Sequence, residues 1–301
     1  MTVSFENRVA IVTGAGGGLG RAYALELARR GAKVVVNDMG GSRDGAGRSD
    51  AAGVIVDEVM ALGGEAFANG ANVAEPEEVS ALAQEVVARW GRIDILINNA
   101  GILRDRSFAK MDAEDFRSVI DVHLIGTANC TKAVWDVMRA QNYGRILMTS
   151  SSSGLFGNFG QSNYGAAKLG ILGLARTLHL EGAKYGIKVN TLAPTAATRM
   201  TEDIFPPAML DAFRPEAVVP AALFLVSEDA PSNIVLGAGA GVYQAAFLTL
   251  TRGIALPQEE QTVEGVQAHW DAIIDRTGEL TPQSGAEQAM SIIDAINRRG
   301  G

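Results

Sequence analysis

The chain has 301 residues, of which 47% are hydrophobic and 20% charged, a composition typical of one folded domain with a sizeable core. Its 26 Lys and Arg against 34 Asp and Glu give a net charge of −8, and no basic block interrupts the sequence, which argues against nucleic-acid or anionic-membrane partners. Cys130 is the single cysteine, which excludes an internal disulfide and a cysteine-based metal site and fits a reducing compartment.

No apolar run reaches the roughly 18 residues that a membrane span needs, and the N-terminus lacks the pattern of a secretory signal peptide. We therefore expect a cytoplasmic protein without a membrane span.

Short β-branched runs alternate with longer amphipathic segments through the first two thirds of the chain. The short runs predict strands at Val9–Thr13, Lys33–Asp38, Glu65–Ala68, Ile93–Asn98, Arg145–Thr149 and Lys188–Leu192. The three-and-four spacing of apolar residues predicts helices at Leu19–Arg30, Ala51–Leu62, Pro76–Trp90, Ala113–Arg139 and Ser162–Tyr185. This order predicts an α/β fold, a Rossmann-type doubly wound parallel sheet with helices on both faces.

The alternation weakens after Pro194, and the prolines from residue 206 onward suggest a lid at Met200–Pro220. Beyond it we expect a helix at Ala217–Ser227, a strand-like run at Asn233–Leu236, a β-prone segment at Val242–Leu256 and helices at Val263–Ile274 and Glu287–Ile296. We expect one catalytic domain at residues 1–240 and a C-terminal appendage at 241–301 that packs on the core or on another subunit.

A glycine-rich turn, Thr13 to Gly20, joins the first strand to the first helix. Doubly wound sheets bind a dinucleotide at this position, because glycines let the backbone approach the pyrophosphate and the helix N-terminus offers N–H donors. The position of the motif, more than its pattern, favours cofactor binding over a plain turn.

Asp38 ends the second strand, eighteen residues beyond Gly20. A carboxylate there accepts hydrogen bonds from the ribose hydroxyls and repels a 2′-phosphate, which favours NAD over NADP. The alternative is an Asp that only caps a turn, and Arg43 and Arg48 in the long loop that follows keep NADP as the second choice of cofactor.

Tyr164 and Lys168 are four residues apart in a predicted helix and therefore lie on one face. A nearby ammonium, together with the positive ring of an oxidised nicotinamide, lowers the pKa of a phenol and makes it an acid–base group. Ser151 follows the preceding strand, thirteen residues before Tyr164.

With the glycine turn and Asn98-Asn99-Ala100-Gly101 after the fourth strand, this set resembles the short-chain dehydrogenases/reductases over residues 6 to 240. The resemblance implies that Ser151 hydrogen-bonds the substrate oxygen, that Tyr164 exchanges its proton, and that Lys168 holds the nicotinamide ribose. It implies cofactor contacts at Thr13, Gly14, Gly18, Leu19, Gly20, Asp38, Asn72, Val73, Asn99, Ala100, Gly101, Tyr164, Lys168, Pro194, Thr195 and Thr198.

His123 departs from the family, which usually has an Asn at this point for a water relay to the lysine. It is a candidate catalytic residue that could pass protons, although a helix histidine is more often structural. His179 and His269 match no motif, and the sequence supports no metal site.

Within the family, the sequences of four segments are similar to those of (3R)-hydroxyacyl-CoA dehydrogenases. These segments are Val36–Gly41, Asn98–Phe108, Val122–Leu124 and Gly157–Gln161. This implies NAD-dependent oxidation of a (3R)-3-hydroxyacyl-CoA to a 3-oxoacyl-CoA, with a separate enoyl-CoA hydratase as the source of substrate. Subunit pairing through the long helices near Asp112 and Ser162 implies a homodimer or homotetramer.

Two enzyme alternatives share the same proton chemistry: a hydroxysteroid dehydrogenase and an NADPH-dependent 3-oxoacyl carrier-protein reductase. A non-catalytic NAD-sensing regulator is the remote alternative, because it would not need Ser151, Tyr164 and Lys168 together.

Overall fold

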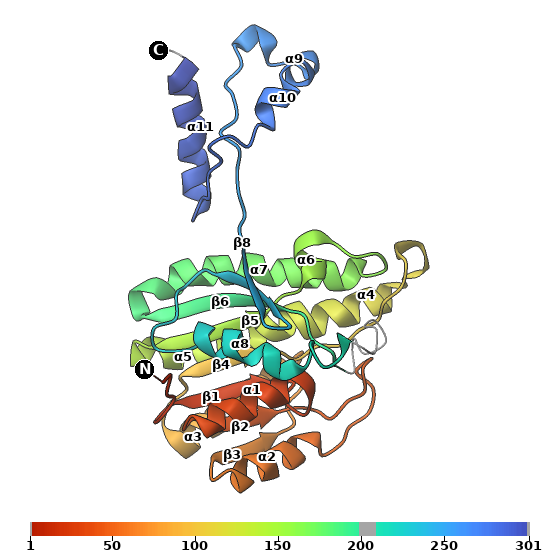
Figure 1. The fold of residues 1–301 in the computed structure, drawn as a ribbon, viewed down its shortest axis with the longest axis vertical. Helices are drawn as coiled ribbons and strands as arrows, with labels where there is room; N and C mark the ends of the chain where they lie inside the picture. The colour runs from red at the N-terminus through yellow and green to blue at the C-terminus, as the bar shows by residue number, and fades with distance from the viewer. Residues whose placement is uncertain (1, 199–208, 300–301) are drawn as a thin grey trace. The chain divides into compact units, whose positions relative to one another are not determined.

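The computed structural model describes residues 2–198 and 209–299, and the chain divides into two compact units after Ala245 (Figure 1). The division falls five residues beyond the boundary expected from the sequence, because β8 (Val242–Ala246) continues the sheet of the first unit. Each unit is described by itself.

The first unit is built on an eight-stranded sheet in the order β3-β2-β1-β4-β5-β6-β7-β8. Its other strands are β1 (Val9–Thr13), β2 (Lys33–Asn37), β3 (Glu65–Asn69), β4 (Ile95–Asn98), β5 (Gly144–Thr149), β6 (Ile187–Pro194) and β7 (Val235–Gly239). All pairings from β3 to β7 are parallel. The predicted Rossmann-type doubly wound sheet is confirmed.

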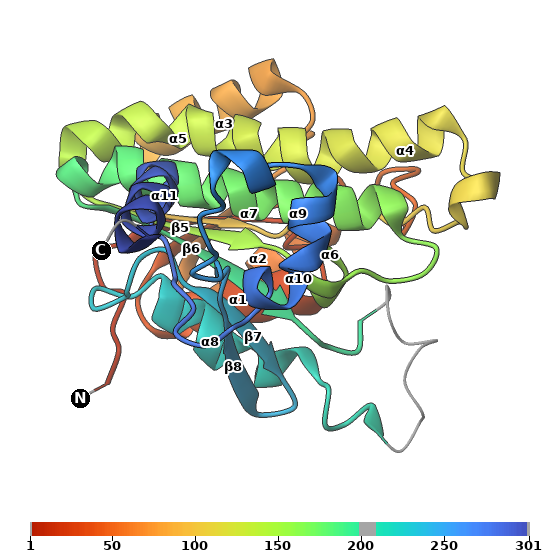
Figure 2. The ribbon, with the colours of Figure 1, turned by 90° about the horizontal axis from the view of Figure 1, so that it is seen from above.

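Helices cover both faces of the sheet (Figure 2). One face carries α1 (Gly18–Arg29), α2 (Ala51–Ala61) and α8 (Val219–Leu225). The other face carries α3 (Pro76–Trp90), α5 (Gly126–Gln141) and α7 (Ser162–Gly182), with α4 (Ala113–Ile120) packed on α7.

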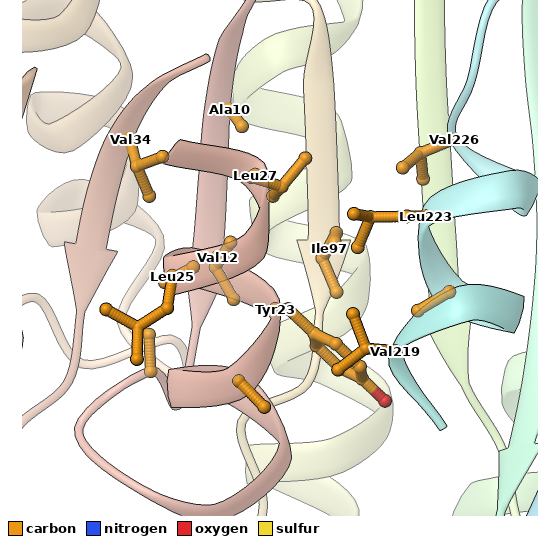
Figure 3. Close-up of a cluster of buried hydrophobic side chains, with 14 of the residues drawn as sticks. Ala10, Val12, Tyr23, Leu25, Leu27, Val34, Ile97, Val219, Leu223 and Val226 are labelled. Carbon is orange, nitrogen blue, oxygen red and sulfur yellow. The ribbon is translucent and has the colours of Figure 1, made fainter. Parts of the chain in front are cut away.

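Each central strand is buried on both sides, which explains why β1 reads as a continuous apolar run. Ala10 and Val12 point into the core under α1 and α8, where Tyr23 and Leu223 also lie (Figure 3). Val9 and Ile11, the alternate residues, enter the core on the opposite face. A sheet packed on both faces is a rigid support for a site at the carboxyl ends of its strands.

The strand order reverses between β1 and β4, since β2 and β3 extend to one side of β1 and β5 to β8 to the other side of β4. A doubly wound sheet opens a crevice at such a switch point, at the carboxyl ends of its strands. The glycine turn after β1 and the Asn98–Gly101 segment after β4 therefore lie at the same crevice.

The helix predicted over Ala113–Arg139 is interrupted. A π-helical turn at Asp121–Ile125 separates α4 from α5, and it contains His123. The apolar spacing does not reveal this turn, because one extra residue per turn leaves the flanking three-and-four pattern intact.

The second unit contains α9 (Val263–Ala268), α10 (Trp270–Ile273) and α11 (Gly285–Arg299). The helix predicted at Val263–Ile274 breaks at His269, and the predicted strand from Val242 ends at Ala246, with an isolated bridge between Leu250 and Leu280 farther on. How this unit packs stays a prediction.

Residues 200–208 of the predicted lid lie outside the described residues; its described end holds a 3₁₀ turn at Pro215–Ala217. Among the helices described, none is long and apolar enough to cross a membrane.

Candidate active site

The glycine turn is tightly closed against the end of β4. A Cβ on Gly14 would lie 2.7 Å from Cα of Ala100, and one on Gly20 would lie 2.2 Å from the carbonyl oxygen of Gly14. The amide of Asn99 donates from Nδ2 to the carbonyl oxygens of Thr13 and Gly14, at 3.0 Å each. Thr13 Oγ1 in turn accepts from the backbone N–H groups of Asn99 and Ala100. These contacts explain why glycine is needed here.

Beside this turn lies a cavity of about 400 Å³. Its lining includes predicted cofactor residues that follow five strands, namely Gly14, Gly18, Leu19, Asp38, Asn72, Val73, Asn99, Ala100, Gly101 and Thr198. Thr13 and Gly20 shape the turn, whereas Pro194 and Thr195 lie at the end of β6, outside this lining. The size and the backbone-lined floor fit a nucleotide cofactor.

Asp38 lies directly after β2 and holds the turn as well as lining the cavity. Its Oδ2 accepts from the N–H of Gly16 at 2.8 Å, and its Oδ1 accepts from the N–H of Gly40 at 2.6 Å. Asp38 is thus a turn residue that also lines the cavity, and its contact with a ribose stays a prediction.

The long loop after Asp38 reaches across to the segment that follows Gly101. The N–H of Leu103 donates to the carbonyl of Arg43 at 3.0 Å, and Arg104 Nε contacts the carbonyl oxygen of Asp44 at 3.4 Å. Ile102 and Arg104 also line the cavity, although they were not among the predicted cofactor residues; their place in the family-like segment Asn98–Phe108 and the length of the loop were the available signals.

Ser151, Tyr164 and Lys168 come together at the carboxyl end of β5. Ser151 caps α6 (Ser152–Phe156) and its hydroxyl hydrogen-bonds the Tyr164 phenol. Lys168 Nζ lies 5.4 Å from the centre of the Tyr164 ring and donates to the carbonyl of Thr149 at 2.7 Å. The structure thus brings the three predicted residues into one cluster.

Burial dominates the electrostatics of this cluster. It raises the pKa of Tyr164 to about 12, against the opposing effect of the Ser151 hydrogen bond. It lowers the pKa of Lys168 to about 7, because a buried ammonium loses its hydration. The shift for the phenol has the opposite direction to the one that the nearby amine alone would cause.

Asp105 is a neighbour that the sequence reasoning missed. Its negative charge further raises the pKa of Tyr164. Gln161 holds it in place, donating from Nε2 to Asp105 Oδ2 at 2.7 Å, while the Gln161 Oε1 accepts from Ser153 Oγ, also at 2.7 Å. Asp105 and Gln161 lie in the family-like segments Asn98–Phe108 and Gly157–Gln161, and this resemblance was the sequence signal for them.

His123 is buried in the π-helical turn, with its ring centre 5.1 Å from that of Tyr164. It does reach the catalytic cluster, and its role stays a prediction. Within residues 2–198 and 209–299, no group of three or more His, Cys, Asp or Glu side chains is arranged to hold a metal ion.

Comparison with known proteins agrees with this geometry. Residues 8–208 match the profile of the family described as "short chain dehydrogenase". The chain is 47% identical over 298 residues to the peroxisomal multifunctional enzyme type 2 of Mus musculus, covering 98% of this chain and 40% of that protein. It is also 47% identical to the putative short-chain type dehydrogenase/reductase Rv0148 of Mycobacterium tuberculosis, covering 91% of this chain and 96% of that one.

Among solved structures, full-length peroxisomal multifunctional enzyme type 2 from Drosophila melanogaster superposes with a TM-score of 0.82 at 36% identity. The match covers 98% of this chain and 50% of that protein. The chain thus spans half or less of these two multifunctional enzymes, and matches one part of each.

Proposed function

We propose that this chain oxidises (3R)-3-hydroxyacyl-CoA to 3-oxoacyl-CoA with NAD. The premise is that the chain belongs to the short-chain dehydrogenase family and is an oxidoreductase. The observation that carries the proposal is the cluster of Ser151, Tyr164 and Lys168 in a fold that also has a glycine-lined cavity; these three residues are not part of the cavity lining. The acyl-CoA substrate is supported by the resemblance of the quoted sequence segments to (3R)-hydroxyacyl-CoA dehydrogenases, together with the similarity to the multifunctional enzymes.

The cavity residues fit a dinucleotide. Gly14 and Gly18 bring backbone close to where a pyrophosphate would bind, and the N-terminus of α1 offers N–H donors. Asp38 would hold the adenosine ribose and disfavour a 2′-phosphate, although Arg43 in the same lining keeps NADP as the alternative. When bound, NAD⁺ supplies the hydride acceptor for the alcohol carbon.

The side chains of this protein manage the proton and the oxygen. Ser151 donates its hydroxyl hydrogen to the substrate oxygen and steadies the charge that develops there. Tyr164 takes the proton from the substrate hydroxyl, for which its phenol must first ionise. Because burial opposes that ionisation, positive charge from Lys168 has to offset part of its cost.

A panel of substrates tests the proposal directly. Purified protein is assayed by NADH absorbance with (3R)-3-hydroxyacyl-CoA esters of several lengths and with hydroxysteroids, and in reverse with a 3-oxoacyl carrier protein and NADPH. We expect turnover of the acyl-CoA esters, and a loss of about 100-fold or more in Tyr164→Phe with NADH affinity preserved. Activity on steroids alone, or full turnover by Tyr164→Phe, would contradict the proposal.

The assembly and the source of substrate remain part of the proposal. A homodimer or homotetramer and a separate enoyl-CoA hydratase would complete the scheme. The cytosol stays a prediction as the compartment, since relatives with peroxisomal names are among the matches.

A further inference from the structure

His123 is a buried residue in an unusual helical element. It is 2% exposed and stands in the π-helical turn between α4 and α5, a rare element that is often kept at functional sites. Its Nδ1 has no hydrogen-bond partner among the described residues. An orphaned buried polar atom costs free energy, so an apolar ring would be the more stable choice if His123 only filled space.

One edge of the ring holds the segment that lines the cofactor cavity. Nε2 lies 2.8 Å from the carbonyl oxygen of Ile102 and 3.1 Å from its N–H. Nε2 can accept from the N–H of Ile102 or donate to its carbonyl oxygen, according to the tautomer of the ring. In either tautomer it makes a hydrogen bond to the backbone of Ile102, a residue that lines the cavity.

The same ring supports the catalytic tyrosine. The planes of His123 and Tyr164 are perpendicular, with centres 5.1 Å apart, which is a favourable edge-to-face arrangement. The ring also fills the space that Gly101 leaves: a Cβ on Gly101 would lie 2.2 Å from Cε1 of His123. The missing side chain at Gly101 lets the histidine reach Ile102.

We propose that His123 is a positioning residue that contacts both the cofactor-binding segment Gly101–Ile102 and the Tyr164 ring. It thereby fixes the position of the tyrosine relative to the cofactor. It touches neither substrate nor proton in this role. The proposal rests on the assignment of Tyr164 as the acid–base group, and it replaces the proton carrier considered from the sequence.

The charge state of the ring agrees with a fixed support. Burial and the nearby Lys168 lower the pKa of His123 well below its usual range, so the ring stays neutral near pH 7.

Two substitutions separate the two contacts. His123→Phe keeps an aromatic edge for Tyr164 but loses the hydrogen bond to Ile102, and we expect the Kd for NADH to rise about ten-fold with kcat nearly preserved. His123→Gln keeps an amide donor but loses the ring, and we expect kcat to fall about three- to ten-fold with the Kd for NADH preserved. The Kd values are measured by NADH fluorescence.

His179→Gln is the matched control, because His179 is a partly buried histidine on α7 that contacts Ser232 instead of the catalytic cluster. It should change neither quantity. If both His123 variants match the wild type, or if both lose NADH binding and kcat equally while remaining folded by circular dichroism, the ring does not link the two sites. Loss of one limb of the pH profile of kcat in either variant would instead identify a proton carrier.

The wild-type protein provides a test that needs neither substrate nor a folded variant. With three histidines in the chain, ¹⁵N resonances of the imidazoles are readily assigned. We expect the His123 ring to stay neutral from pH 6 to 8, in a single tautomer fixed by its contact with Ile102. Titration of His123 in that range, or exchange between the two tautomers, would overturn the proposal. Absence of turnover on every alcohol would count against the proposed function while leaving the NADH-binding and NMR results to decide the role of His123.

Discussion

Asp38 holds the glycine turn, and we propose that it also selects the cofactor. Because its two oxygens accept from Gly16 and Gly40, removing it should loosen the turn as well as remove a charge. We predict that Asp38→Asn, which keeps one acceptor, shifts the ratio of kcat/KM for NAD over NADP by about ten-fold toward NADP. Asp38→Ala should shift the same ratio and also lower Tm. An unchanged ratio in both variants would show that Asp38 is only a turn residue.

Lys168 should leave a signature in the pH dependence of stability. Burial lowers its pKa to about 7, so above that pH the unfolded chain binds a proton that the folded protein has released. The free energy of unfolding of the cofactor-free protein is therefore expected to gain about 2 kcal/mol from this residue between pH 7 and pH 9. Urea titrations of wild type and Lys168→Met measure it; identical pH slopes would contradict the shifted pKa.

The sequence predicted which residues gather at the site better than it predicted their electrostatics. A four-residue interval places Tyr164 and Lys168 on one helix face wherever the helix lies. Burial depends on the neighbours that cover them, and the charge of Asp105, far away in sequence, adds to its effect on Tyr164. For that reason the direction of the Tyr164 shift was not predictable from spacing.

At the scale of an element, the glycine turn depends on close approach of backbone to backbone. We predict that Gly20→Ala destabilises the protein by about 2 kcal/mol or more, because its Cβ would lie 2.2 Å from the carbonyl oxygen of Gly14. Gly173→Ala on α7 is the control: its Cβ would meet nothing within 4 Å, and the change should stabilise the helix by up to about 1 kcal/mol. Thermal and urea unfolding compare them; equal effects would refute this account.

The elements that the sequence predicted correctly are those with one strong periodicity. The runs at Val9–Thr13 and Pro76–Trp90 correspond to β1 and α3 with the same bounds. The π-helical turn at Asp121–Ile125 was not predicted from the sequence. It packs against α7, and the local apolar pattern does not show this contact. The break at His269 likewise carries no proline or glycine to announce it.

At the scale of the whole molecule, the three clusters of buried apolar residues all lie between Phe5 and Ala238. We therefore predict that a chain ending at Ala245 folds cooperatively and binds NADH with an affinity comparable to that of the full chain. Circular dichroism melting and NADH fluorescence check both parts. Loss of cooperative unfolding in the shortened chain would mean that residues 246–301 contribute to the core of the sheet.

At the reversal of strand order between β1 and β4, residues from two different parts of the chain meet, and each part is expected to control a different property. Most of the cavity lining is contributed before residue 102, whereas Ser151, Tyr164 and Lys168 follow β5. Mutations in the earlier half can thus change the nucleotide preference without altering the residues that transfer the proton. Mutations in the later half can change which alcohols are accepted without altering most of the cavity lining. The contacts of His123 with Ile102 and Tyr164 are the route by which a change in one part would still reach the other.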